Sequence, residues 1–99
     1  MKVLHLTLKK KWFDMILSGE KKEEYREIKP YWIKRLTGKC HDVISFTNGY
    51  SKNAPNFRIE LKYIVKGFGI VEWGAKEVDM VYILRLGRIL NKKECEVAK

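Results

Sequence analysis

Apolar and polar residues alternate at the start of the chain. Leu4, Leu6 and Leu8 recur at every second position, with other residue types between them. A β-strand directs successive side chains to opposite faces, so this spacing places the three leucines on one face. Residues 2–8 therefore predict a first, half-buried strand.

The apolar spacing becomes helical in the next segment. Trp12, Phe13, Ile16 and Leu17 fall at intervals of three and four, which places them on one stripe of a helix. Gly19 follows shortly afterwards, and glycine is the residue that most often ends a helix. The pattern predicts a short amphipathic helix that ends just before this glycine.

Later segments predict a second helix and four further strands. Residues 22–28 are dense in charge but include two apolar side chains, which favours an exposed edge strand. Pro30 suits the first turn of a helix, which we expect to end at residues 37–38. Three more strands are predicted, at residues 42–48, 57–66 and 80–86.

These elements predict an α+β fold. About five strands and two short helices, without the spacing of a parallel βαβ sheet, favour a small mixed β-barrel with helices at one end. A chain of 99 residues has the usual size of one domain. We expect a single domain over residues 1–90. A tail of basic and acidic residues follows at 91–99, where the lack of periodicity suggests fraying.

Charge narrows the choice of partner. The sequence holds 21 Lys and Arg against 12 Asp and Glu, a formal net charge of +9, which is large for one domain. Basic proteins gain affinity for nucleic acids when the bound phosphates release their counterions, although a lysine-rich surface also serves solubility alone. The balance favours a polyanionic partner, such as RNA or DNA. An adaptor that binds proteins would instead expose an apolar patch.

Other classes of protein are not favoured. No apolar run reaches the length of a membrane span, and the first residues lack the features of a signal peptide, so we expect a cytoplasmic protein without a membrane partner. Cys40 and Cys95 are the only cysteines, and no CxxC spacing is present. A metal site that joined them to His41 and His5 would need opposite ends of the chain. We expect free thiols, no metal and no cofactor.

The segment between the first helix and the second strand is the strongest candidate site. It reads GEKKEEYR from residue 19 to residue 26. In a regular strand Glu24 and Arg26 share a face, and Lys21 lies in the turn, where it can reach either. A carboxylate between two cations stays ionised, and such a group can bind a phosphate or the edge of a base. A solvated row of surface ion pairs, which contributes little to stability, explains the spacing equally well.

The same segment carries a family resemblance. The segment matches a Gly-x-Lys-x-x-Glu-x-Arg signature position for position, at Gly19, Lys21, Glu24 and Arg26. By this signature the chain resembles the ASCH family of small PUA-like barrels. The similarity to one branch of the family extends over nearly the whole chain, through Trp12-Phe13, Tyr31-Trp32, Asn48-Gly49-Tyr50, Glu72-Trp73-Gly74-Ala75 and Leu86-Gly87-x-Ile89-Leu90. The resemblance implies a barrel with a cleft near its helices that binds RNA, in RNA processing or translation-coupled regulation.

The resemblance also implies an enzymatic alternative. One branch of the family hydrolyses N4-acetylcytidine, and ribonuclease activity is associated with ASCH proteins. In such an enzyme Lys21 and Glu24 would be the catalytic residues, with the lysine as nucleophile or base. The hydrolysing branch has a threonine at the position of Glu24, and the acidic neighbours of Lys21 favour its protonated form unless burial dominates. Binding of RNA, a nucleoside or a nucleotide is therefore the first hypothesis, and hydrolysis the second.

Aromatic and basic residues elsewhere supply further candidate contacts. Tyr31 and Trp32 lie between cations, a combination that single-stranded nucleic acids use for stacking and phosphate contact. We expect Trp32 in the core and Tyr31 nearer the surface. The loop from residue 48 offers an amide and a tyrosine to a base, with plain turn chemistry as an equal explanation. The candidate nucleic-acid-binding residues are Lys21, Glu24, Arg26, Tyr31, Lys34, Arg35, Asn48, Tyr50 and Lys52.

Overall fold

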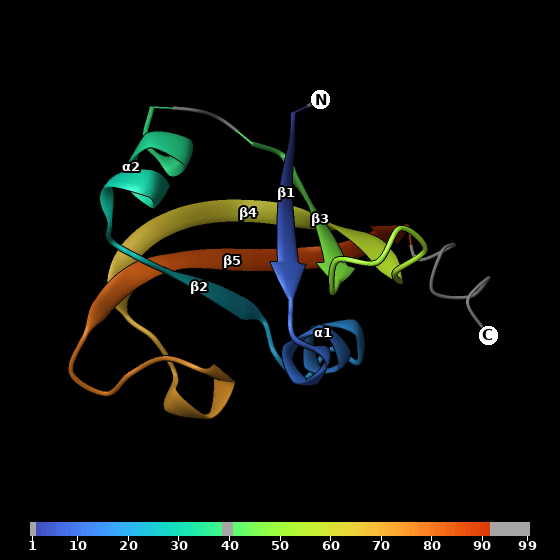
Figure 1. Cartoon of the computed structure of the whole chain (residues 1–99). Coiled ribbons are helices and arrows are strands. Elements are labelled where there is room, and N and C mark those ends of the chain that lie inside the picture. The colour runs from blue at the N-terminus through green and yellow to red at the C-terminus, as the bar shows by residue number, and fades with distance from the viewer. Residues whose placement is uncertain (1, 39–40, 92–99) are drawn as a thin grey trace.

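The computed structural model describes residues 2–38 and 41–91 and shows a curled mixed sheet with two short α-helices (Figure 1). The elements in chain order are β1 (Val3–Leu8), α1 (Lys10–Leu17), β2 (Glu23–Glu27), α2 (Pro30–Leu36), β3 (Val43–Asn48), β4 (Asn56–Phe68), the 3-10 helix η1 (Val71–Trp73) and β5 (Met80–Asn91). The strand order is β1-β3-β4-β5-β2. The predicted small α+β fold is confirmed.

The connection between β1 and β3 decides the shape of the sheet. These two strands pair in parallel, with Val3 opposite Val43, whereas β2 with β5, β3 with β4 and β4 with β5 pair antiparallel. A parallel pair needs a long crossover, which here runs through α1, β2 and α2. Because the crossover delivers β2 to the far side of β5, the strands β1 and β2 become the two open edges of the curled sheet.

The strands β4 and β5 are longer than the sequence pattern predicts, at 13 and 12 residues. The prediction ends β4 at residue 66 because Gly67 weakens a strand, but the ladder continues to Phe68 opposite Met80. It ends β5 at residue 86, directly before Gly87. A Cβ at Gly87 would meet the side chain of Glu60, so the glycine there accommodates a close neighbour within the strand.

The core fills the concave side of the sheet. The three leucines of β1 are buried as predicted, and Phe13 and Ile16 of α1 are buried with them. The rings of Phe13 and Phe57 lie 4.9 Å apart in an edge-to-face arrangement, which is favourable for aromatic pairs. Helix α1 therefore closes one end of the curled sheet, and its apolar stripe is the contact surface.

Some expectations from the sequence fall outside the described residues. They concern Cys40, Cys95 and the tail from residue 92 onward. Within residues 2–38 and 41–91, no group of three or more His, Cys, Asp or Glu side chains is arranged to hold a metal ion. In the same ranges, no helix combines the length and the apolar character that crossing a membrane requires.

Candidate functional site

Lys21, Glu24 and Arg26, here called the charged triad, meet at the beginning of β2. The ammonium Nζ of Lys21 donates a hydrogen bond to Glu24 Oε1 at 2.6 Å, and Arg26 Nη1 donates to Glu24 Oε2. Lys21 is 2% exposed and Glu24 4% exposed. The alternative of a solvated row of surface ion pairs is therefore wrong for these two residues, and the convergence expected from the strand spacing is present.

The turn after α1 places Lys21 in this position. Gly19 has a φ of 88°, in the left-handed region that favours glycine after a helix. The backbone N–H of Lys21 then donates to the carbonyl of Met15 at 2.9 Å. Its ammonium lies 5.3 Å from the ring centroid of Trp12 and 5.0 Å from that of Tyr25. The two rings exclude water from the cation, and both attract it through their π faces.

The cations of the triad also donate hydrogen bonds to backbone carbonyls at the open edge of β2. Lys21 Nζ donates to the carbonyl of Glu23 at 2.8 Å, and Arg26 Nη1 donates to the carbonyl of Tyr25 at 2.7 Å. An edge strand otherwise leaves such carbonyls without a partner strand. The side chains therefore replace part of the missing ladder along β2.

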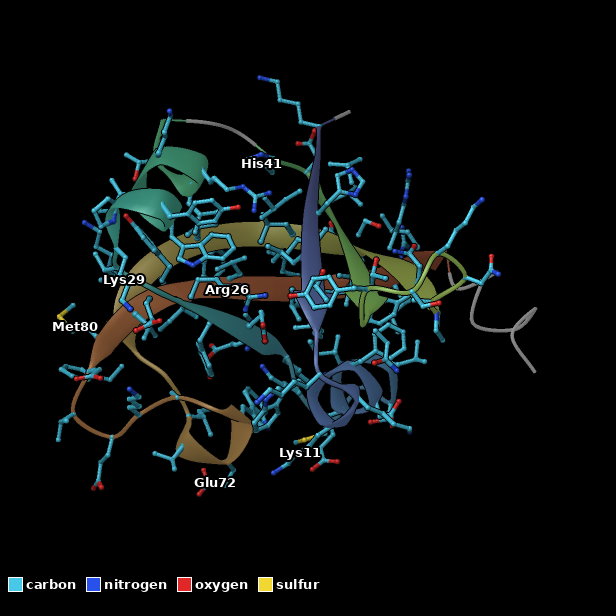
Figure 2. The ribbon with its side chains drawn as sticks, in the orientation of Figure 1. Lys11, Arg26, Lys29, His41, Glu72 and Met80 are labelled. Carbon is cyan, nitrogen blue, oxygen red and sulfur yellow. The ribbon has the colours of Figure 1, made fainter. Side chains whose placement is uncertain are left out.

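Arginine side chains reach the other open edge, on β1. Arg26 Nη2 donates to the carbonyl of Thr7 at 3.4 Å, and Arg35 Nη2, from α2, donates to the carbonyl of His5 at 3.3 Å. Arg26 thus bridges from β2 to β1, and Figure 2 shows it between these two strands. The curled sheet is closed here by side chains instead of by a backbone ladder.

Backbone donors of β1 face the same gap. The carbonyl of Leu8 accepts from the N–H of Gly49, on the side where β1 pairs with β3. Backbone groups of alternate residues in a strand point to opposite sides, so those of His5 and Thr7 point to the open edge. Their carbonyls accept from the two arginines, and their N–H groups remain directed toward the gap.

A cavity of about 550 Å³ occupies the gap between the two edges, a size typical of small-ligand sites. We call it the seam cavity. It is lined by residues 5–9 and 24–27 together with Trp12, Tyr31, Trp32, Arg35, Tyr50, Trp73 and Gly74. All three tryptophans of the chain are among these residues.

Aromatic rings and guanidinium groups form one layered wall of the seam cavity. The rings of Tyr31 and Trp32 meet edge to face at 4.8 Å. The guanidinium carbons of Arg26 and Arg35 each lie 5.2 Å from the ring centroid of Trp32. Trp32 also packs against the core, so it serves both the core and the cavity, whereas Tyr31 is 62% exposed.

The remaining predicted site residues divide into two groups. Arg35 and Tyr50 line the seam cavity. The candidates that do not line it are Lys34, Asn48 and Lys52, of which both lysines are exposed and Asn48 ends β3. The cavity is therefore built from only part of the predicted set.

Several lining residues were not predicted. Trp12 was assigned to the apolar stripe of α1, and His5 and Thr7 to the first strand, and none of them was among the candidate nucleic-acid-binding residues. No pattern in the sequence marks these residues, because their position depends on which strands remain unpaired. Trp73, which belongs to one of the segments that carry the family resemblance, also lines the cavity and directly precedes the turn at Gly74, where φ is 105°.

The catalytic alternative depends on the state and position of Lys21. Burial lowers the pKa of the Lys21 ammonium, and the neighbouring Glu24 carboxylate opposes this change. Glu24 and Arg26 line the seam cavity, but Lys21 does not. The lysine therefore lies behind the carboxylate, where it orients Glu24 from the side away from the cavity.

Tyr25 ties β2 to the segment before η1 and gives the fold a pH dependence. Its hydroxyl donates to Glu23 Oε1 at 2.8 Å and accepts from the N–H of Ile70 at 2.9 Å. Burial, reinforced by Glu23, raises the pKa of the Tyr25 hydroxyl in the folded state. An unfolded tyrosine loses its proton near pH 10, so the free energy of unfolding falls as the pH rises above that value.

Between about pH 8 and pH 11, we expect the free energy of unfolding to fall less in the Tyr25→Phe variant than in the unchanged protein. Urea unfolding at each pH measures this fall. The lowered pKa of Lys21 has the opposite effect on stability. It makes the free energy of unfolding rise with pH, up to the pKa of lysine in the unfolded chain. This contribution is common to both proteins and cancels in the comparison. Equal losses in the two proteins would contradict the assignment to Tyr25.

Comparisons of this chain with protein-family models, with curated proteins and with solved structures yield no match.

Proposed function

We propose that this chain is an RNA-binding domain of the ASCH type whose seam cavity receives an unpaired nucleotide. The observation that carries the proposal is the composition of the cavity wall. It combines the three tryptophans with the guanidinium groups of Arg26 and Arg35. Single-stranded nucleic acids are bound by this combination, since bases stack on aromatic rings and phosphates accept from arginine.

The polar groups of the cavity favour a ligand rich in acceptors. A guanidinium group has five N–H donors, and Arg26 uses only part of this capacity in the bonds to Glu24, Tyr25 and Thr7. Both oxygens of Glu24 already accept from cations, so an amino group of a base is a less favoured partner. Phosphate oxygens and the carbonyl oxygens of uracil complement the donors of the cavity.

The charge of the whole chain supports a nucleic acid over a neutral small molecule. The formal net charge of +9 provides long-range attraction and counterion release on binding phosphates. RNA is favoured over DNA because bases in its loops and bulges are commonly unstacked and accessible to a pocket. The expected partner is single-stranded RNA.

Hydrolysis of N4-acetylcytidine is the weaker proposal. It needs a lysine that approaches the substrate, and the lowered pKa of Lys21 is the one feature in its favour. The ammonium is held by Glu24 and by the carbonyl of Glu23, outside the lining of the seam cavity. Lys21 is therefore better suited to positioning Glu24 than to attacking a ligand.

Tyr31 provides the test of the proposed function. We expect Tyr31→Ala to weaken binding of a short oligouridylate by about 5- to 150-fold, since stacking of a base on an aromatic side chain contributes about 1–3 kcal/mol. Tryptophan fluorescence measures binding directly because all three tryptophans line the cavity.

Tyr63→Ala is the matched control for this experiment. Tyr63 is 52% exposed, close to the 62% of Tyr31, but lies on β4 and does not line the seam cavity. Its replacement should leave the affinity unchanged. If the unchanged protein shows no fluorescence response and no retention of the oligonucleotide, RNA binding in this cavity is refuted.

A further inference from the structure

A second cavity adjoins the seam cavity around the edge of β2. It has a volume of about 370 Å³ and is lined by residues 25–29, 74–76 and 78–81; we call it the flanking cavity. The two cavities share Tyr25, Arg26, Glu27 and Gly74 in their linings. A ligand longer than one nucleotide could therefore pass from one cavity into the other along a common wall.

In the shared wall, Arg26 supplies donors for a phosphate, and the carboxylate of Glu27 is paired with Lys29. Arg26 lines both cavities, and three of its five N–H donors account for its bonds to Glu24 and to the carbonyls of Tyr25 and Thr7. The remaining donors are available to an anion at the boundary. Because Glu24 and the two carbonyls fix the guanidinium group, it requires little reorganisation to receive a phosphate.

The lining of the flanking cavity also includes exposed apolar side chains, next to the charged Lys76 and Asp79. Val78 is 81% exposed and Met80 is 49% exposed, and Ile28 belongs to the same lining. Figure 2 shows Lys29 and Met80 on the same side of the molecule, where β2 and β5 meet the neighbouring loops. Apolar side chains at the mouth of a cavity can cover the face of a base or a ribose while nearby cations attract the chain of phosphates.

We infer that the ligand is an RNA strand of at least two nucleotides, with one nucleoside in each cavity and the connecting phosphate beside Arg26. This inference rests on the proposed function, because it extends the ligand of the seam cavity. It adds a property that a mononucleotide site would lack. A dinucleotide should bind more tightly than a mononucleotide even though it carries less charge.

The test compares uridylyl-3′,5′-uridine with uridine 5′-monophosphate by tryptophan fluorescence. The dinucleotide has one diester charge, whereas the monophosphate carries close to two charges at neutral pH. We expect the dinucleotide to bind about tenfold more tightly or better, because of the second nucleoside. It contains both a 3′-linked and a 5′-linked uridine, so either direction of the strand is covered.

A substitution in the flanking cavity tests whether the higher affinity for the dinucleotide arises there. Val78→Asp should abolish the advantage of the dinucleotide and leave the affinity for the monophosphate within about twofold, because Val78 lines only the flanking cavity. Val71→Asp is the control, since Val71 is also exposed, at 53%, but lines neither cavity. It should retain the advantage.

The outcomes separate the two proposals. Equal affinities for the monophosphate and the dinucleotide would overturn the inference and leave the seam cavity as a mononucleotide site. An advantage that survives in Val78→Asp would also overturn it, because the second nucleoside would then lie elsewhere. If neither ligand binds, the proposed function itself fails.

Discussion

Glu24→Ala is expected to lower the free energy of unfolding by about 3–5 kcal/mol, because removal of one partner leaves a buried charge uncompensated. Lys21 is 2% exposed, and its ammonium is 2.6 Å from Glu24 Oε1. Without the carboxylate this cation loses its ion pair, and it retains the hydrogen bond to the carbonyl of Glu23 and its contacts with the two aromatic rings. Urea unfolding at neutral pH measures the loss.

Two controls define this result. Asp14→Ala removes the exposed ion pair with Lys10, in which the side chains are 50% and 77% exposed, and should cost only about 0.3–0.5 kcal/mol. The double variant Lys21→Met with Glu24→Leu removes both buried charges and should be more stable than Glu24→Ala alone. If Glu24→Ala unfolds as readily as Asp14→Ala, the buried pair described above does not exist in solution.

Arg35→Ala is expected to weaken binding of a short oligouridylate by about 10- to 100-fold, in keeping with the loss of a charged hydrogen bond to a phosphate. Arg35 lines the seam cavity, bonds the carbonyl of His5 and stacks on Trp32. Titrations at several salt concentrations should also show a weaker salt dependence in this variant. The slope of log K against log salt concentration should be smaller in magnitude by about 0.7 than in the unchanged protein, which is the value for one phosphate contact on a single strand.

The neighbouring residue supplies the control. Lys34 has the same charge and belongs to the same helix, but it does not line the seam cavity. Lys34→Ala should therefore change the affinity by no more than about twofold, as expected for an exposed charge outside the contact. Comparable losses in the two variants would place the ligand along the outer surface of α2 instead of in the cavity.

The sequence predicts the local parts of this structure well. The period of two in β1, the helical stripe of α1 and the turn at Gly19 each depend on neighbouring residues. The charged triad also spans only six residues, so the spacing of Lys21, Glu24 and Arg26 was enough to bring them together. These features follow from the geometry of single elements.

The parts that depend on distant contacts could not be predicted. Burial of Lys21 requires the rings of Trp12 and Tyr25 to cover it, whereas the local sequence left a solvated row of ion pairs as an equal alternative. The seam cavity requires β1 to pair with β3 and β2 to pair with β5, since this pairing leaves the two open edges that Arg26 bridges to Thr7. Strand pairing of this kind is not encoded in any local pattern.

The closure of the sheet by arginine explains how a small curled sheet can contain a cavity between two of its strands. Strands joined by a backbone ladder lie about 4.8 Å apart, and nothing larger than their own hydrogen bonds fits between them. A guanidinium group on a long side chain spans a wider opening, as Arg26 does between β2 and β1. The length of the Arg26 side chain thus contributes to the separation of the two strand edges, and Arg26→Lys, which keeps the charge but gives up the forked geometry, would change the shape of the seam cavity.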